Sequence, residues 1–242
     1  MASPIIDPMD IAPVARSAVS DSVFAHLVDE ILSGRVAVDD ALPSERELAL
    51  AFAVNRHAIR EALKRLQQAR LVRISHGGKT RVQDWRQTAG LDVLSTLAAT
   101  GAVPALQIAR DIMVMRRSVA ADAARLCARN ATAEQLASIA AAAAAYPAQR
   151  TDESFAVDLT FWTAIIDGSG NLAYRLALNT LVAAFTDIGF DSIADLGMAA
   201  ELIDREAHIT LAEHLVARDA DAAHRVADEL LGRVVDTLSA RQ

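Results

Sequence analysis

The chain has 242 residues, which is long enough for two ordinary domains. Hydrophobic residues make up 52% of it and aromatic residues only 4%, a composition that favours helices packed through small side chains over a β-sandwich. No signal-peptide pattern opens the chain, and charged residues interrupt its apolar stretches before they reach membrane-spanning length. We therefore expect a mainly α, cytoplasmic protein without a membrane partner.

The formal net charge is −7, but this charge is unevenly distributed. Residues 43–82 hold nine Lys or Arg against three acids, a net of +6, so the rest of the chain carries −13. Such asymmetry is typical of a basic nucleic-acid-binding domain joined to an acidic partner domain. The nine basic residues are Arg46, Arg56, Arg60, Lys64, Arg65, Arg70, Arg73, Lys79 and Arg81.

Residues 1–19 contain three prolines and no sustained hydrophobic period, which predicts a mobile N-terminal arm. Apolar residues at helical spacing then predict a first helix over residues 23–32, ended by Gly34. Ser44 and Glu47 form a capping-box pattern that predicts the start of a second, short helix.

A third helix is predicted to begin after Asn55, which can cap it. Its apolar positions share one side, whereas Arg56, His57, Arg60 and Lys64 fall elsewhere. The second and third helices therefore form a helix-turn-helix with a basic exposed face.

Two short runs of alternating character, residues 71–74 and 80–82, flank a Gly-Gly turn and predict a β-hairpin. His76 and Lys79 lie at its tip. A hairpin directly after a helix-turn-helix is a candidate wing, so we assign residues 20–85 to a winged helix-turn-helix domain.

Residues 86–242 show helical stretches only. Breaks near residues 101–104, 130–132, 145–147, 168–171 and 217–219 predict six or seven helices in an all-α bundle. The single cysteine, Cys127, lies in an Ala/Arg-rich helical run and is best explained as a small buried residue.

The predicted DNA-binding residues are those that open the helix-turn-helix. Arg56 and Arg60 are one turn apart, and Arg46 opens the preceding helix. Arginine suits guanine edges or bidentate phosphate contact, while Asn55 and His57 lie at the helix start, where side chains approach bases.

These stretches resemble a known family. Residues 42–48 (LPSEREL), 55–63, 71–72 and the tip at 76–78 are similar to the N-terminal domain of GntR-type regulators, and the helical remainder is similar to their FadR branch. The resemblance extends from about Val23 to Leu238. It implies DNA contacts at Arg46, Arg56, Arg60, His76 and Gly77.

Many members of this branch bind a metal through Asp and His four residues apart and two later histidines. In this sequence Asp158 and His208 match that pattern, but Trp162 and Leu230 occupy the other two positions. The resemblance also places Arg116 on an early helix that faces the cavity. It therefore implies a metal-free, more hydrophobic ligand site, with no cofactor, formed by these five residues.

We expect a homodimer that binds a palindromic DNA operator as a repressor and releases it on binding a long-chain fatty acyl-CoA. A metal-dependent sensor of organic acids is the alternative. An enzyme is a more remote alternative, because the chain lacks the common catalytic motifs. A protein-binding helical adaptor is another, because an adaptor needs neither a basic helix nor a wing.

Overall fold

The computed structural model describes residues 17–74, 78–94, 96–97, 101, 103–188 and 199–241. The chain divides into two compact units, the first ending at Thr96 and the second beginning at Leu97. Most of the predicted N-terminal arm, residues 1–16, lies outside the described residues. Two short helices fall in the first unit: α4 (Trp85–Thr88), which spans the 85/86 boundary expected from the sequence, and η1 (Leu91–Val93), which follows it.

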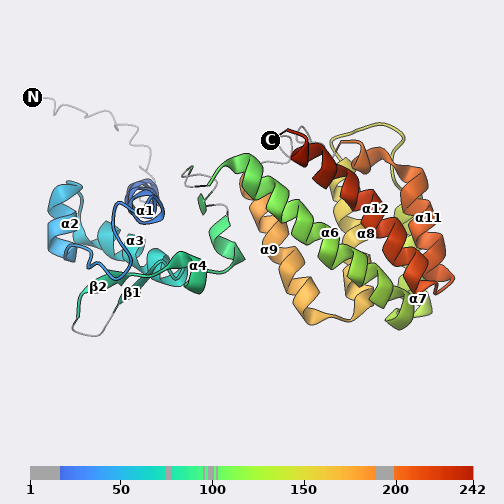
Figure 1. Cartoon of the computed structure of the whole chain (residues 1–242), viewed down its shortest axis with the longest axis horizontal. Helices are drawn as coiled ribbons and strands as arrows, with labels where there is room; N and C mark the ends of the chain where they lie inside the picture. The colour runs from blue at the N-terminus through green and yellow to red at the C-terminus, as the bar shows by residue number, and fades with distance from the viewer. Residues whose placement is uncertain are drawn as a thin grey trace, which may run out of the picture. The chain divides into compact units, whose positions relative to one another are not determined.

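The first unit packs three helices and a hairpin around one small core (Figure 1). Helix α1 (Ser17–Leu32) packs against α3 (Arg56–Gln68), and α2 (Glu45–Ala51) precedes α3. Strands β1 (Val72–Ile74) and β2 (Thr80–Val82) pair antiparallel, with Val72 opposite Val82. The most buried side chains of this core are those of Val28, Ile59, Ala62, Leu66 and Leu71.

The starts of α2 and α3 are set by local capping, as the sequence predicts, whereas α1 begins at Ser17, earlier than the residues 23–32 expected for it and inside the predicted arm. Ser44 accepts a hydrogen bond from the Glu47 N–H, and the Glu47 carboxylate accepts from the Ser44 N–H, so the capping box is complete. Between α2 and α3, Ala53 has a φ of 53°, which turns the chain sharply. The predicted helix-turn-helix and hairpin are both confirmed.

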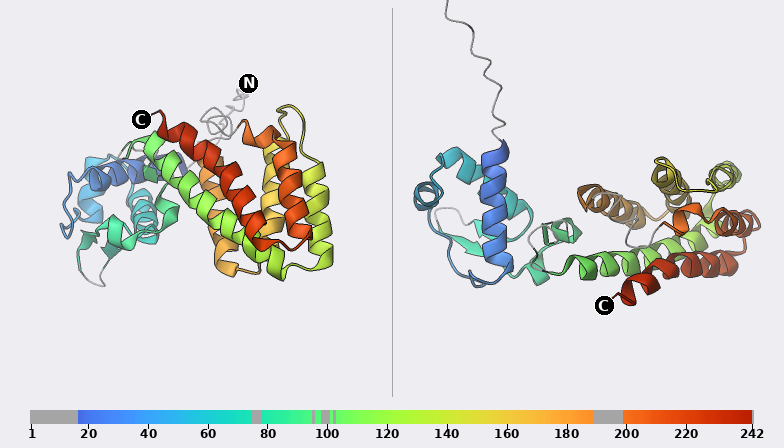
Figure 2. Two further views of the ribbon diagram at one scale, coloured as in Figure 1. Left: turned by 45° about the vertical axis from the view of Figure 1, so that its right-hand side comes forward. Right: turned by 90° about the horizontal axis from the view of Figure 1, so that it is seen from above.

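The second unit is a helical bundle built on two long helices, α6 (Ala105–Asn130) and α12 (Ala220–Ser239), which run antiparallel side by side (Figures 1 and 2). Helix α8 (Ser154–Ser169) packs against α6, and α11 (Arg205–Val216) packs against α12 and α7 (Ala133–Ala144). Helix α9 (Leu172–Ile188) contacts α8 and α6. None of the described helices is both long and apolar enough to cross a membrane.

All five predicted breaks of this unit occur, and the described residues include a turn that the sequence does not predict. A three-residue 3-10 turn, η3 (Glu201–Ile203), precedes α11, and the Asp204 side chain caps α11 by accepting from the Ala207 N–H at 3.0 Å. The residues from Glu201 to Asp204 include no glycine or proline, so the turn lacks the usual local signal.

Gly168, in the last turn of α8, lies close against Cys127 of α6. A Cβ at this position would lie 2.6 Å from Cys127 Sγ and 3.3 Å from the Ala131 Cβ. We expect Gly168→Ala to lower the free energy of unfolding by about 1 to 3 kcal/mol, as overpacked cores do.

The matched test is the double variant Gly168→Ala/Cys127→Ala, which removes the sulfur that the new methyl group meets. Denaturant unfolding should show that the double variant recovers much of the lost stability. If the stability loss of the double variant equals the sum of the losses of the two single variants, this account of the contact between α6 and α8 is contradicted.

Candidate functional site

The starts of α2 and α3 carry a basic exposed face. Arg46, Arg56, His57 and Arg60 are all exposed. The opposite side of α3 is buried in the core of the first unit through Ala58, Ile59, Ala62, Leu63 and Leu66. Because the apolar side anchors α3, its cationic side is held outward, where a polyanion can reach it.

Asn55 serves as the N-cap of α3. Its Oδ1 accepts a hydrogen bond from the Ala58 N–H at 2.9 Å, and its backbone is extended. From the sequence, Asn55 was expected both to cap the helix and to approach a base. The cap is confirmed; it uses one of the two lone pairs of Oδ1, and the contact with a base stays a prediction.

Arg60 forms an ion pair with Glu45, one of the three acidic residues of the basic segment 43–82. Arg60 Nε donates to Glu45 Oε2 at 2.8 Å, which links α3 to the start of α2. Both side chains are more than one third exposed, so the pair contributes at most about 1 kcal/mol to stability. Its main effect is to restrict the directions in which the guanidinium can point.

A groove of about 1100 Å³ lies between the hairpin, the start of α2 and the middle of α3. Its wall includes Arg60, Lys64 and the exposed Lys79, together with Glu45 and Glu47. Lys79 therefore lies near the basic face of α3. The other two predicted wing residues, His76 and Gly77, lie outside the described residues.

The second unit contains a buried ionic cluster centred on Arg116, in the middle of α6. Arg116 Nη1 donates to Glu201 Oε2 at 3.0 Å and Nη2 to Glu201 Oε1 at 2.5 Å, so one carboxylate fills the guanidinium fork. Nη2 also lies 3.3 Å from Asp158 Oδ2. The exposed fractions are 9% for Arg116, 3% for Asp158 and 2% for Glu201.

Aromatic side chains enclose the other side of Asp158. Its Oδ1 accepts from the Tyr146 hydroxyl at 2.9 Å and from Trp162 Nε1 at 3.2 Å. His208 stacks on Tyr146 with ring centroids 3.7 Å apart, and Phe161 meets His208 edge-on. We call Arg116, Tyr146, Asp158, Trp162, Glu201 and His208 together the Arg116 cluster.

One ring nitrogen of His208, in the Arg116 cluster, has no hydrogen-bond partner among the described residues. Its Nδ1 lies 2.7 Å from the Asp204 carbonyl oxygen, which requires a proton on Nδ1 because a carbonyl only accepts. Its Nε2 is buried, has no hydrogen-bond partner among the described residues, and lies 3.8 Å from Asp158 Oδ1. The side chain itself is fully buried.

Burial shifts the protonation equilibria of this cluster. It raises the pKa of Asp158 to about 7; Arg116 opposes this shift and Glu201 adds to it. Burial alone would lower the pKa of Arg116, but the carboxylates of Glu201 and Asp158 outweigh it and raise that pKa. Burial lowers the pKa of His208, which favours the neutral ring, and raises the pKa of Tyr146.

The Arg116 cluster does not fit a metal ion. A cation beside Asp158 would face the guanidinium of Arg116, 3.3 Å from that carboxylate, and would displace the Tyr146 and Trp162 donors. The indole of Trp162 offers a donor and no lone pair for a metal. No group of three metal-ligating side chains occurs among the residues that the structure describes.

A pH dependence of stability follows from Asp158. Its folded-state pKa of about 7 exceeds the ordinary value of 3.8, so the folded chain holds an extra proton between these values. Unfolding free energy should therefore fall as the pH rises from about 4 to about 7, by at most about 4 kcal/mol, since one pKa unit corresponds to about 1.36 kcal/mol.

Asp158→Asn should remove this component and leave the contribution of His208, whose pKa burial lowers. The measurement is denaturant unfolding of the full chain at pH 5 to 8, followed by Trp162 fluorescence in a Trp85→Phe background. The same pH slope with and without the Asp158→Asn substitution in this background would contradict the assignment.

The structure brings together four of the five predicted ligand-site residues, Arg116, Asp158, Trp162 and His208, in one cluster. The fifth, Leu230, is buried in the same apolar core as Trp162. Sequence reasoning missed Tyr146 and Glu201. Tyr146 lies in a predicted break, where a buried tyrosine is unusual, whereas nothing local distinguishes Glu201.

Two family models match this chain, one over each unit. "Bacterial regulatory proteins, gntR family" matches residues 19–82, and "FCD domain" matches residues 111–233, about half of the chain. The chain belongs to the GntR family. It is a transcription regulator, not an enzyme, with an N-terminal helix-turn-helix and a C-terminal FCD domain.

Relatives of this GntR-family protein support the assignment. The HTH-type transcriptional regulator Mce2R of Mycobacterium tuberculosis is 34% identical over 73% of this chain and 74% of its own length. The fatty acid metabolism regulator protein of Yersinia enterocolitica is 32% identical over 68% of each chain. The solved structure of Lar from Listeria monocytogenes, 13% identical, covers 96% of this chain and all of its own, with a TM-score of 0.57, and shows the shared fold alone.

Proposed function

We propose that this regulator is a homodimeric repressor that binds a palindromic operator and releases it when a long-chain acyl-CoA binds the FCD domain. The observation that carries the DNA-binding part is the basic exposed face at the starts of α2 and α3. Its cations project from a helix whose other side is fixed in the core. A helix of this kind enters the major groove in helix-turn-helix proteins.

We assign base contacts to Arg56 and His57, and phosphate contacts to Arg46 and Lys79, in each half-site. Among the described residues no carboxylate forms an ion pair with Arg46 or Arg56, so both guanidinium groups are available to DNA. Arg60 also contacts DNA, with its guanidinium oriented by the ion pair with Glu45. His76 and Gly77 complete the wing, where a glycine permits close approach to the backbone.

Two observations support an acyl ligand in the FCD domain. The relatives include regulators of fatty acid metabolism. In addition, Trp162 and Leu230 are buried apolar residues at positions where related sensors have imidazoles, and Trp162 lies beside the polar groups of Asp158, Arg116 and His208. Apolar walls with a few convergent polar groups suit an acyl chain with a charged head.

The test begins with selection of the operator from fragmented genomic DNA of the source organism. Oleoyl-CoA should then lower operator affinity at least tenfold in chelator-treated protein; this factor corresponds to about 1.4 kcal/mol of coupling. CoA without an acyl chain is the control. Stoichiometric zinc or nickel, with a ligand response that is lost on chelation, would overturn the proposal in favour of a metal-dependent organic-acid sensor.

A further inference from the structure

The carboxylate of Glu201 binds the guanidinium of Arg116 in the way a bound anion would. Both of its carboxylate oxygens accept from the two terminal nitrogens of Arg116, at 3.0 and 2.5 Å, and its side chain is almost completely buried. This fork geometry is the one by which arginine recognises free carboxylates and phosphates. The position where Arg116 would hold an effector's anionic group is therefore filled by the chain itself.

The two partners sit on elements of different rigidity. Arg116 lies in the interior of the 26-residue helix α6, whereas Glu201 begins the three-residue turn η3. Fewer backbone hydrogen bonds hold a 3-10 turn of this length than hold a residue inside a long helix. Loss of the ion pair would therefore shift Glu201 and leave Arg116 in place.

η3 is connected to the rest of the FCD domain through Asp204. The Asp204 N–H donates to the Glu201 carbonyl at 3.1 Å, its side chain caps α11, and it pairs with Arg233 of α12. η3 also packs directly on α8 and α12. A displacement of Glu201 would thus be transmitted to the start of α11 and to Arg233 within α12.

The unpartnered Nε2 of His208 is an independent sign that the Arg116 cluster lacks a component. An unsatisfied buried polar group costs about 1 to 3 kcal/mol. Since Nδ1 carries the proton of the neutral ring, Nε2 is an acceptor and requires a donor. A water molecule or hydroxyl group brought in with a ligand would supply it.

We propose that Glu201 is an internal pseudo-ligand: it holds Arg116 in the effector-free regulator, and an anionic oxygen group of the effector displaces it. This inference rests on the proposed function only in placing the effector in the FCD domain. The shared chemistry is a pair of anionic oxygens, which a fatty carboxylate and the phosphates of an acyl-CoA both provide. Uncharged acyl compounds cannot make this exchange.

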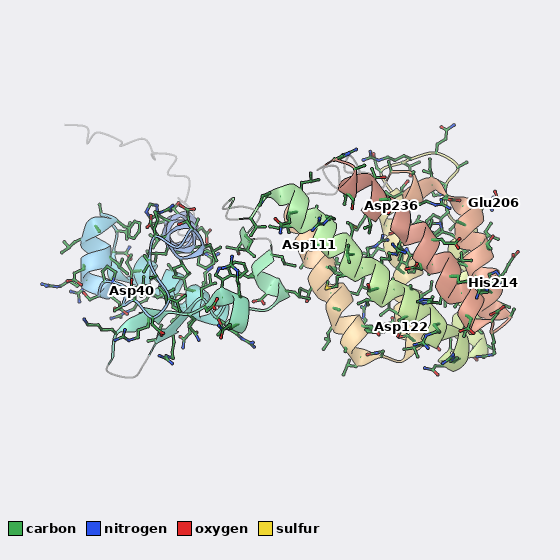
Figure 3. The ribbon with its side chains drawn as sticks, viewed as in Figure 1. Asp40, Asp111, Asp122, Glu206, His214 and Asp236 are labelled. Carbon is green, nitrogen blue, oxygen red and sulfur yellow. The ribbon has the colours of Figure 1, made fainter. Side chains whose placement is uncertain are left out.

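The decisive variant is Glu201→Gln, which keeps the side-chain size and removes the charge that competes with the effector. Its matched control is Glu206→Gln, at an exposed position on α11 five residues away (Figure 3). Calorimetry on the full chain should show at least tenfold tighter binding of an anionic ligand by Glu201→Gln and no change for Glu206→Gln. Oleate and oleoyl-CoA distinguish the two head groups, and oleyl alcohol is the uncharged reference.

A second measurement needs no acyl ligand. In Glu201→Ala, acetate can enter the vacated position beside Arg116, so acetate should raise the melting temperature of this variant more than chloride at equal ionic strength. The wild type and Glu206→Gln should respond equally to the two salts. Glu201→Ser, whose short side chain also leaves room beside Arg116, serves if Glu201→Ala does not fold.

The two measurements separate the inference from the proposed function. Acetate stabilisation of the Glu201 variants without binding of any acyl compound would support the pseudo-ligand and overturn the acyl effector. Equal binding of oleate and oleoyl-CoA by the wild type and Glu201→Gln, with no specific acetate effect, would overturn the pseudo-ligand and leave the acyl effector standing.

Discussion

At pH 8, above the pKa of about 7 of Asp158, Arg116→Met is expected to lower the free energy of unfolding of the FCD domain by about 3 to 5 kcal/mol, because it leaves two buried carboxylates without their cation. Asp158 and Glu201 are both at least 97% buried, so water cannot replace the guanidinium. Denaturant unfolding followed by Trp162 fluorescence, in a Trp85→Phe background, measures the loss.

The neighbouring residue provides the matched control for this prediction. Arg117 forms an equally bidentate pair with Asp228, with both bonds at 2.6 Å, but these side chains are 35% and 37% exposed. Arg117→Met should therefore cost about 1 kcal/mol or less. Equal losses in the two variants would show that burial does not control the contribution of the Arg116 cluster.

Compensation gives a further check on the same prediction. If the loss in Arg116→Met arises from the uncompensated carboxylates, the triple variant Arg116→Met/Asp158→Asn/Glu201→Gln should recover a large part of it, because no buried charge then remains unpaired. Absence of any recovery would indicate that packing of the arginine side chain, and not its charge, is lost.

Arg56→Ala is expected to remove specific operator binding. One bidentate arginine–base contact contributes about 1 to 3 kcal/mol of discrimination, and a symmetric dimer loses it in both half-sites, so the affinity should fall at least about thirtyfold. Gel retardation at fixed salt measures the loss. Circular dichroism should stay unchanged, since Arg56 is exposed and lies opposite the buried side of α3.

Arg225→Ala is the control for Arg56→Ala. Arg225 is an exposed arginine of α12, in the other unit, and its replacement changes the net charge by the same amount. Operator affinity should remain at the wild-type value. Wild-type operator affinity in Arg56→Ala, or an equal loss of affinity in Arg225→Ala, would contradict the assignment of α3 as the recognition helix.

The architecture of the first unit was predictable because its signals are local. Ser44 and Glu47 are three residues apart, Asn55 caps the helix that begins at the next residue, and the two strands flank a Gly-Gly turn. Each of these features depends on side chains and backbone groups within one turn or hairpin. The pairing of Arg60 with Glu45, fifteen residues away, already required the folded structure.

In the FCD domain, helical periodicity and break residues determined the helices, and the resemblance indicated four side chains that do meet. Only the tertiary structure decided what those side chains do. Arg116 is 42 residues from Asp158 and 85 from Glu201 in the sequence, and no periodic pattern relates such distant positions. Whether a charged residue faces water or a buried partner depends on how α6, α8 and η3 pack, because burial makes an uncompensated charge too costly to retain. For that reason the sequence alone determined that a basic helix-turn-helix precedes an acidic helical domain, and packing decided that Arg116 is held by a carboxylate of its own chain.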